Sequence, residues 1–326
     1  MALLEVKNLT VGIKKGKNTL KAIDNISFSI KEGEITGLAG ESGCGKTMTA
    51  LAIMNLLPLG FRILDGEIIF NGQSLTALNE KHLCRIMGSE IGMVFQDVRQ
   101  SLNPLMKVGK QITEMMELSK TDNKQNALEM LSLLGFEEPE KIFDAYPHQL
   151  SRGMCQRVMI TIAAIRRPKL LLADELTSAL DEENQKRIIS LLLEMNQKYK
   201  TSILFISHEL SIIQEFCSRF FVMYAGKIIE ENTVQGDTLY CALHPYTNAL
   251  IDAMPSKEKR GKKLKSISGK VPSIEDRFMG CPFAPRCPKA QTICREVFPP
   301  EYFHNIGKER NKVYCYYPQI KGDTYE

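Results

Sequence analysis

The chain has 326 residues, of which 44% are hydrophobic and 25% charged, and its net charge is +4. This length can bury a large core, and the composition is that of an ordinary globular protein. So mild a positive charge does not indicate nucleic-acid binding. No apolar run approaches the roughly 18–20 residues that cross a bilayer, and the N-terminus becomes polar too early for a signal peptide. We therefore expect a cytosolic protein that reaches a membrane only through a partner.

Short apolar segments predict strands in the first third of the chain, at residues 4–9, 26–30, 34–39 and 67–71. The third of these leads into a match to the phosphate-loop pattern G-x-x-x-x-G-K-[ST], and a helix is expected at residues 47–57. A strand, a glycine-rich turn and a helix start form the geometry that this motif needs.

The phosphate loop consists of Gly40, Glu41, Ser42, Gly43, Cys44, Gly45, Lys46 and Thr47. Its glycines let backbone N–H groups converge on phosphates, and the new helix adds the positive end of its dipole. We expect Lys46 to reach the β and γ phosphates and the Thr47 hydroxyl to bind Mg²⁺. Cys44 occupies a variable position of the motif, so no redox role is expected for it.

Residues 97–165 are predicted to be mostly helical, with helical apolar spacing at 106–118 and 127–134. Residues 166–230 return to alternating strand and helix, which predicts a mainly parallel sheet. One apolar strand there ends in Asp174 and Glu175, and ligands collect beyond the carboxyl ends of such strands. We expect Asp174 to bind Mg²⁺ and Glu175 to orient and deprotonate an attacking water.

Three further polar residues follow predicted strands or the acidic pair in the order that a nucleotide-binding site would need. Gln96 follows the strand expected at 91–95, Asp181 follows the acidic pair, and His208 follows the strand expected at 201–207. Alone, they would be a loop amide, a helix N-cap and a surface histidine. Together with the phosphate loop, their spacing resembles the nucleotide-binding domain of ABC transporters over about residues 1–250.

The resemblance implies an α/β P-loop NTPase fold with an N-terminal antiparallel β part and an inserted helical subdomain at about 97–165. It implies that Gln96 senses the γ-phosphate, contacts Mg²⁺ and links to the membrane subunit. It also implies that His208 steadies the γ-phosphate and the water, and that Asp181 acts across a dimer. Ser151, Arg152 and Gly153 occupy the signature that completes the ATP site of the other subunit.

The chain departs from the family pattern at three positions. Arg152 replaces the first glycine of the L-S-G-G signature, and it could either crowd a loop that needs positive φ or add a favourable charge toward phosphate. Leu176 replaces a proline after the catalytic glutamate, for which we expect a small effect. Ile13 lies near the position of the aromatic that usually stacks on adenine, so another residue is left to supply that contact.

Several stretches resemble the ATPase subunits of oligopeptide, dipeptide and nickel importers, among them SLNP at 101–104, HPYTNAL at 244–250 and CPFAPRC at 281–287. The implied protein hydrolyses ATP as a sandwich dimer, with a related second ATPase subunit, two membrane permease subunits and, indirectly, an external solute-binding protein. Its implied place is the cytoplasmic face of the membrane. Alternatives are a soluble ABC ATPase, which the single phosphate loop opposes, and a poorly hydrolysing structural subunit. The phosphate-binding and catalytic residues of this chain match the family pattern, whereas the altered signature with Arg152 would complete the ATP site of the partner. We therefore hypothesise a heterodimer with unequal sites.

The last fifty residues contain four cysteines, Cys281, Cys287, Cys294 and Cys315. Four thiolates can hold zinc or an iron–sulfur cluster, and their long spacing suits a larger cluster better than paired zinc knuckles. The resemblance favours a [4Fe-4S] cluster, with zinc and unliganded thiols as the alternatives. The expected domains are an ABC domain at 1–250, a basic linker at 251–270 and a small Cys-rich C-terminal extension at 271–326.

Overall fold

The computed structural model describes residues 1–16, 18–116, 120–178, 180–234, 242–254, 266–276, 279–306 and 309–319. The basic run at 256–265 lies outside these ranges, so its proposed linker role stays a prediction. The described chain forms two compact units. Unit 1 contains Met1–Leu3, Ile30–Ile35 and Asn71–Ile206, and unit 2 contains Leu4–Ser29, Thr36–Phe70 and Ser207–Glu326.

Unit 1 combines three parallel strands with a series of helices. Its strands are β6 (Ile91–Val94), β7 (Leu170–Asp174) and β8 (Ser202–Ser207), and β7 pairs in parallel with both neighbours. Every residue of the three strands is buried, which explains why their sequences are continuous apolar runs without alternation. The 18-residue helix α8 (Glu182–Tyr199) connects β7 to β8, as a parallel pair requires.

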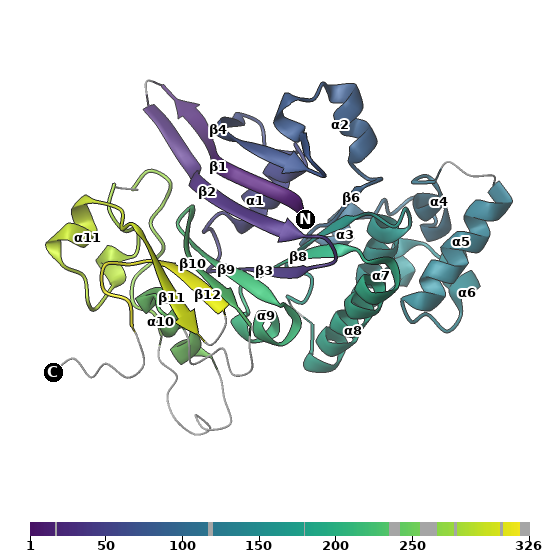
Figure 1. Cartoon of the computed structure of the whole chain (residues 1–326). Coiled ribbons are helices and arrows are strands. Elements are labelled where there is room, and N and C mark those ends of the chain that lie inside the picture. The colour runs from purple at the N-terminus through teal and green to yellow at the C-terminus, as the bar shows by residue number, and fades with distance from the viewer. Residues whose placement is uncertain are drawn as a thin grey trace. The chain divides into compact units, whose positions relative to one another are not determined.

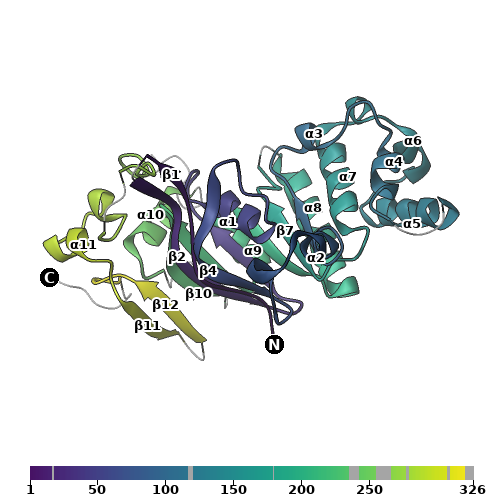
Figure 2. The same ribbon diagram turned by 90° about the horizontal axis from the view of Figure 1, so that it is seen from above.

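Between β6 and β7 the described chain is helical. The helices are α3 (Val98–Ser101), α4 (Val108–Thr113), α5 (Lys120–Leu133), α6 (Pro139–Asp144) and α7 (Arg152–Ala164). Helices α4, α5 and α6 contact one another, and α7 lies against α4 and α5 (Figure 2). The helical spacing seen at 106–118 and 127–134 is thus realised in α4 and α5. The short β5 (Gln73–Ser74) and α2 (Glu80–Ile86) also belong to this unit.

Unit 2 contains an antiparallel β part. Strand β1 (Ala2–Lys15) lies between β2 (Asn18–Lys31) and β4 (Phe61–Phe70), and it is antiparallel to β4. The strand expected at 34–39 is β3 (Ile35–Ala39), so all four strands expected in the first third of the chain are present. The other three, β1, β2 and β4, are longer than predicted. Helix α1 (Lys46–Ile53) has Met54 as its C-cap and ends before the expected residue 57, because Asn55 adopts the left-handed conformation with φ 55°.

The C-terminal strands continue a sheet of unit 2. The order is β11 (Glu301–Ile306), β12 (Glu309–Tyr314), β10 (Lys227–Thr233), β9 (Arg219–Tyr224) and β3. Strand β3 is parallel to β9, and the other pairs are antiparallel (Figure 1). The cysteine-rich C-terminal part is therefore joined to the strand that carries the phosphate loop by a continuous ladder of hydrogen bonds. Helix α9 (Leu210–Phe216) precedes β9.

A buried carboxylate anchors α10 (Pro245–Ala253) to this sheet. Glu230 of β10 is fully buried and accepts hydrogen bonds from the backbone N–H groups of Leu243 and His244 and from the Thr247 hydroxyl. Burial raises the pKa of Glu230 to about 7, against the opposing effect of these hydrogen bonds. The first turn of α10, in the segment that begins with HPYT, therefore donates hydrogen bonds to the Glu230 carboxyl group. An acidic group at this place suits the positive end of the helix dipole.

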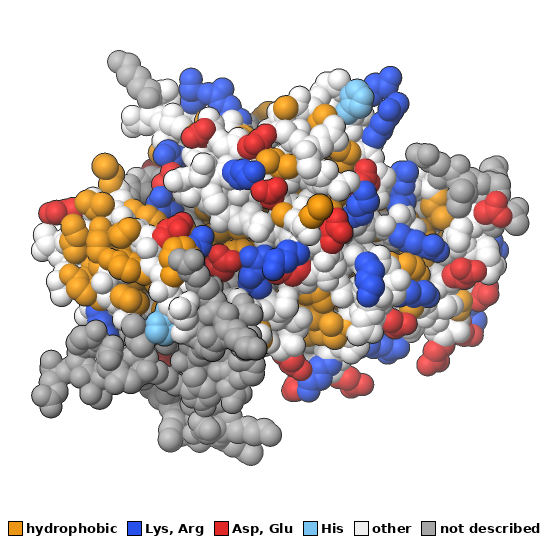
Figure 3. Space-filling view, viewed as in Figure 1, with side chains coloured by type: hydrophobic (Ala, Val, Ile, Leu, Met, Phe, Trp, Pro, Cys, Tyr) orange, Lys and Arg blue, Asp and Glu red, His pale blue; other side chains and the backbone are white. Residues whose placement is uncertain are grey.

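Apolar side chains gather on the surface over α11 (Thr292–Glu296) and the chain around it (Figure 3). They include Val297, Phe303 and Tyr302, which are 51%, 48% and 42% exposed. None of the described helices is long and apolar enough to cross a membrane.

Candidate functional site

The phosphate loop connects β3 to α1 as the motif predicts. Gly40 has φ 152°, and a Cβ there would overlap the carbonyl oxygen of Met223, so only glycine fits. Lys46 opens α1 with a side chain that is almost fully buried. Its Nζ donates hydrogen bonds to the carbonyl oxygens of Gly40 at 2.8 Å and Glu41 at 3.2 Å. The ammonium group is thus held inside its own loop, where phosphate oxygens can replace the carbonyls.

The side chains of the loop differ in their exposure to solvent. Thr47 and Ser42 are exposed, so both hydroxyls are accessible to a ligand. Cys44 is fully buried, and burial raises the pKa of its thiol. A buried neutral thiol is a poor nucleophile, which agrees with the expectation that Cys44 has no redox role.

The acidic pair closes β7 in unit 1. Asp174 is the last residue of the strand and is 1% exposed, and Glu175 is 8% exposed. Gln96 Nε2 donates a hydrogen bond to Glu175 Oε2 at 3.0 Å. The structure therefore brings together two of the three residues predicted to be catalytic, Gln96 and Glu175, and the amide faces the carboxylate that would accept the proton.

Glu175 has φ 48°, the left-handed conformation, which is costly for a residue other than glycine. Two contacts hold it there: its N–H donates to the Ile206 carbonyl at 2.9 Å, and its carbonyl accepts from the Ser178 hydroxyl at 2.8 Å. Leu176 follows with 1% exposure, so a buried side chain stands where the family has proline. Backbone strain at this position is a feature of functional sites.

The signature forms the start of α7. Ser151 is the N-cap, with its hydroxyl accepting the Met154 N–H at 3.2 Å. Arg152 is the first residue of the helix, it is exposed, and its φ is negative. The arginine therefore fits without the strain that a positive φ would impose. Of the two effects left open for it, added charge remains.

The start of α8 lies beside the signature. Asp181 caps this helix through the Asn184 N–H at 2.9 Å, and Asn184 Oδ1 lies 3.8 Å from where a Cβ at Gly153 would stand. Hydrogen bonds from Asn184 lower the pKa of Asp181, so the cap is anionic. The predicted signature and the predicted dimer-contact residue thus share one surface of unit 1.

His208 follows β8 and is exposed. It belongs to unit 2 with the phosphate loop, whereas Gln96, Asp174 and Glu175 belong to unit 1. Its predicted role at the γ-phosphate stays a prediction.

The four late cysteines line one cavity of about 20 Å³, together with His244 and residues near α11. All four thiols are free: Cys281, Cys294 and Cys315 are buried and Cys287 half-buried. Burial raises the pKa of Cys281 to about 11 and that of Cys315 to about 12. Among the described residues, no group of three or more Cys, His, Asp or Glu is placed to hold a metal ion.

His244 is a functional candidate that the sequence did not single out. Its Nδ1 accepts the Tyr246 N–H at 3.0 Å, so Nε2 carries the ring proton. That Nε2 is buried and has no hydrogen-bond partner among the described residues, while the ring lines the cysteine cavity. Burial lowers the pKa of His244 to about 3, so the ring is neutral. The cavity therefore offers one N–H donor beside four sulfur atoms.

A second residue missed in the sequence is Phe61. Strands β1 and β4 pair Ile13 directly with Phe61, so the aromatic ring stands next to the position where the family usually has its adenine contact. Only strand register reveals this neighbour, because 48 positions separate the two residues.

Comparisons with known sequences agree with this architecture. Residues 23–178 match the ABC transporter family, and residues 232–294 match the oligopeptide/dipeptide transporter C-terminal region. The chain is 41% identical to the oligopeptide transport ATP-binding protein AppD of Bacillus subtilis over 98% of both chains. It is 43% identical to the dipeptide transport ATP-binding protein DppD of Haemophilus influenzae, over 98% of this chain and 96% of that one.

Solved structures share the fold. The ATP-binding cassette MJ0796, determined as a dimer in a post-hydrolysis state with ADP and Pi, gives a TM-score of 0.64 at 28% identity. The match covers 72% of this chain and 99% of that one. CbiO1 from Clostridium perfringens gives a TM-score of 0.62 at 26% identity, over 71% of this chain and 88% of that one.

The phosphate loop, the acidic pair and this fold define an ATP-hydrolysing P-loop protein of the ATP-binding-cassette class. More narrowly, the chain belongs to the ABC transporter family, in the group that carries the oligopeptide/dipeptide transporter C-terminal region.

Proposed function

We propose that the chain energises a membrane importer for peptides or related small solutes, with nickel chelates as the alternative solute. Its relatives over nearly the whole length are ATP-binding proteins of oligopeptide and dipeptide transport. The observation that carries the proposal is the hydrogen bond from Gln96 to Glu175 at the end of β7, in a chain whose phosphate-loop sequence is intact. A structural subunit without turnover does not need that base.

The chain works as one half of a nucleotide-sandwich dimer at the cytoplasmic face of the membrane. The dimeric state of the solved cassette supports this arrangement. Two permease subunits and, indirectly, an external solute-binding protein complete the importer. In the resemblance, the helical subdomain receives the permease, and α4 to α6 are the helices of this chain that correspond to it.

In hydrolysis, Lys46 and the loop N–H groups hold the β and γ phosphates. Thr47, Gln96 and Asp174 would hold Mg²⁺, which would supply positive charge to offset the charge that develops on the phosphate oxygens. Glu175 accepts a proton from water as the water oxygen bonds to the γ-phosphorus. The bond from that phosphorus to the bridging oxygen breaks, and its electron pair leaves with ADP. His208 steadies the γ-phosphate at this step.

The signature of this chain acts on the ATP of the partner subunit. Ser151 and the first N–H groups of α7 face that phosphate, and exposed Arg152 brings a cation to it. The site that contains Lys46 is completed by a partner's signature. We infer a heterodimer with two unequal ATP sites, in which the added cation of Arg152 holds phosphate more tightly, so that the site it completes turns over more slowly.

The cysteine cavity is proposed to bind a [4Fe-4S] cluster, with zinc as the alternative. The proposal is supported by the lining of one cavity, which contains the four free cysteines and the ring of His244. Among the described residues, His244 Nε2 has no hydrogen-bond partner. Hydrogen bonds to sulfur are a normal part of cluster sites. The cluster would compensate the charge of the buried thiolates and would hold this loop-rich segment together. Its proposed role is structural.

The test of the proposed function is solute uptake by the reconstituted importer. Proteoliposomes that contain this chain with its partner subunits should take up peptide only with ATP and the solute-binding protein. Lys46→Ala in this chain should abolish uptake while the complex still assembles. ATP-independent uptake, or uptake that survives Lys46→Ala, would contradict the proposal.

A further inference from the structure

Glu41, the second residue of the phosphate loop, is held by the C-terminal part of the chain. Arg286 Nη1 donates to Glu41 Oε2 at 2.7 Å, and Nη2 donates to Oε1 at 3.1 Å, so the guanidinium grips both carboxylate oxygens. The Glu41 backbone N–H donates to the Tyr246 hydroxyl at 2.8 Å. The loop is thus restrained at the backbone and at the side chain of one residue, by two partners more than 200 positions away.

The guanidinium itself cannot move freely. The Arg286 side chain is 6% exposed, and it also donates to the Tyr224 hydroxyl at 3.1 Å and to the Ser268 carbonyl at 2.7 Å. It lies over the rings of Tyr224 and Phe283, at 5.7 and 6.0 Å from their centroids. Cation–π contacts and a bidentate carboxylate are interactions that lysine reproduces poorly.

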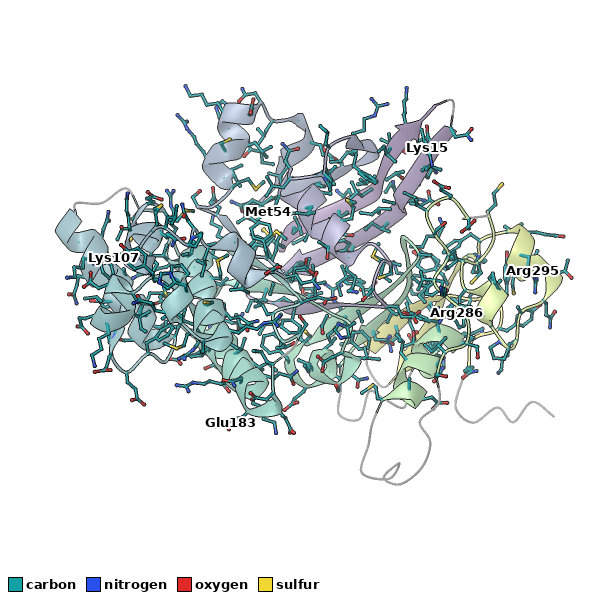
Figure 4. The ribbon with its side chains drawn as sticks, turned by 180° about the vertical axis from the view of Figure 1, so that it is seen from behind. Lys15, Met54, Lys107, Glu183, Arg286 and Arg295 are labelled. Atoms are coloured by element: carbon teal, nitrogen blue, oxygen red, sulfur yellow. The ribbon has the colours of Figure 1, made fainter. Side chains whose placement is uncertain are left out.

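The aromatic side chains under Arg286 form one cluster. Tyr224 meets Tyr246 at 4.6 Å and Phe283 at 5.3 Å between ring centroids, and all three residues are at most 1% exposed. Tyr224 closes β9, the strand beside β3, while Tyr246 opens α10. The surroundings of Arg286 are therefore built from rigid elements, and the guanidinium points into them, whereas Arg295 lies at the outer side of α11 (Figure 4).

Charge gives this contact a consequence for nucleotide binding. The phosphate loop contains one cation, Lys46, and one anion, Glu41. Without a counter-ion, the carboxylate would oppose Lys46 and repel a polyphosphate at a distance where charges are only partly screened. A bidentate arginine compensates that charge, so that Lys46 gives the loop a net positive charge.

We propose that Arg286 is a positioning residue of the ATP site, because it holds the Glu41 carboxylate in place and compensates its negative charge. Through this contact the cysteine-rich C-terminal part supports the phosphate loop. Arg286 precedes Cys287 directly and follows Phe283 within the same short turn. The segment that carries two of the four cysteines is thus also the segment that supports nucleotide binding.

The experiment is a set of variants in the full-length chain, with Mg·ATP affinity measured by calorimetry and KM and kcat measured in the assembled complex. Arg286→Ala should raise the Kd and the KM for ATP about tenfold, and should lower kcat less than KM rises. Arg295→Ala, which removes an exposed arginine from the same region, is the matched control and should leave both values unchanged.

The decisive variant is the double substitution Glu41→Gln with Arg286→Ala, which removes the uncompensated charge. Its Kd should return to within about threefold of the wild-type value, because repulsion is the main cost in the single variant. A double variant as weak as Arg286→Ala, or an Arg286→Ala protein with wild-type affinity, would overturn the proposal. Should Arg286→Ala not fold, Arg286→Lys keeps the stem and a cation: an intermediate Kd supports the account, and wild-type affinity refutes it.

Discussion

Gln96 and Glu175 are joined by a hydrogen bond of 3.0 Å between Nε2 and Oε2, although 79 positions separate them in the chain. Parallel pairing of β6 with β7 creates this contact, because both residues follow the carboxyl ends of adjacent strands. The amide therefore orients the carboxylate. Gln96→Ala should lower kcat for ATP hydrolysis roughly 10- to 100-fold and change the Kd for ATP little. Equal losses in affinity and turnover would instead show that Gln96 acts mainly in binding.

Arg152 is predicted to limit the partner's ATP site and not the site of its own chain. Arg152→Gly should raise ATP turnover only when the partner subunit is present. Glycine at the first position of α7 should cost at most about 1 kcal/mol of stability. The measurement compares ATPase rates of the isolated chain and of the assembled complex. An unchanged rate in the complex would remove the case for unequal sites.

Phe61 is predicted to supply the adenine contact that Ile13 cannot. Phe61→Ala should weaken ATP binding about three- to tenfold through loss of ring stacking. Binding of inorganic tripolyphosphate, which has no base, should be unaffected and serves as the control ligand. Equal weakening of both ligands would mean that Phe61 supports the β part and does not touch the base.

Glu230 predicts a dependence of stability on pH. Its pKa in the folded chain is about 7, above the ordinary value of 4.5, so between these pH values the folded state keeps a proton that the unfolded chain has lost. The contribution is complete below about pH 4.5 and is lost as pH rises through about 7, on the order of 3 kcal/mol. Denaturant unfolding from pH 4.5 to 8 should show this decline, and Glu230→Gln should flatten it. A wild-type slope in the variant would assign the decline to other groups.

The cysteine cavity predicts a bound metal cluster. Protein purified without oxygen should show visible charge-transfer absorption and about four iron atoms per chain, and Cys294→Ser should lose both together with thermal stability. Colourless protein with one zinc per chain would support the alternative. Colourless protein free of metal would leave the cysteines as plain thiols and contradict the proposal.

Local sequence signals carried much of the fold. The phosphate loop and the apolar run before Asp174 each follow from a few adjacent residues, and the structure has the expected elements there. Asp181 is a helix N-cap, the role that it would have on local sequence alone. The helix after the loop was predicted too long because no local signal marks the left-handed turn at Asn55.

The parts that could not be predicted depend on distant contacts. The pairing of Phe61 with Ile13, the grip of Arg286 on Glu41 and the place of His244 beside the cysteines all arise from strand register and helix docking. The sequence motifs around His244 and Arg286 were recognised as family features, but their chemistry becomes visible only when partners far along the chain are placed.

The central claim is that Glu175 is the base of an ATP-hydrolysing importer subunit. The most direct test is phosphate release by the assembled importer that carries Glu175→Gln in this chain, with the partner's ATP site inactivated. The account predicts that ATP binds with undiminished affinity and that phosphate release falls at least about 100-fold. Phosphate release close to the wild-type rate would contradict it.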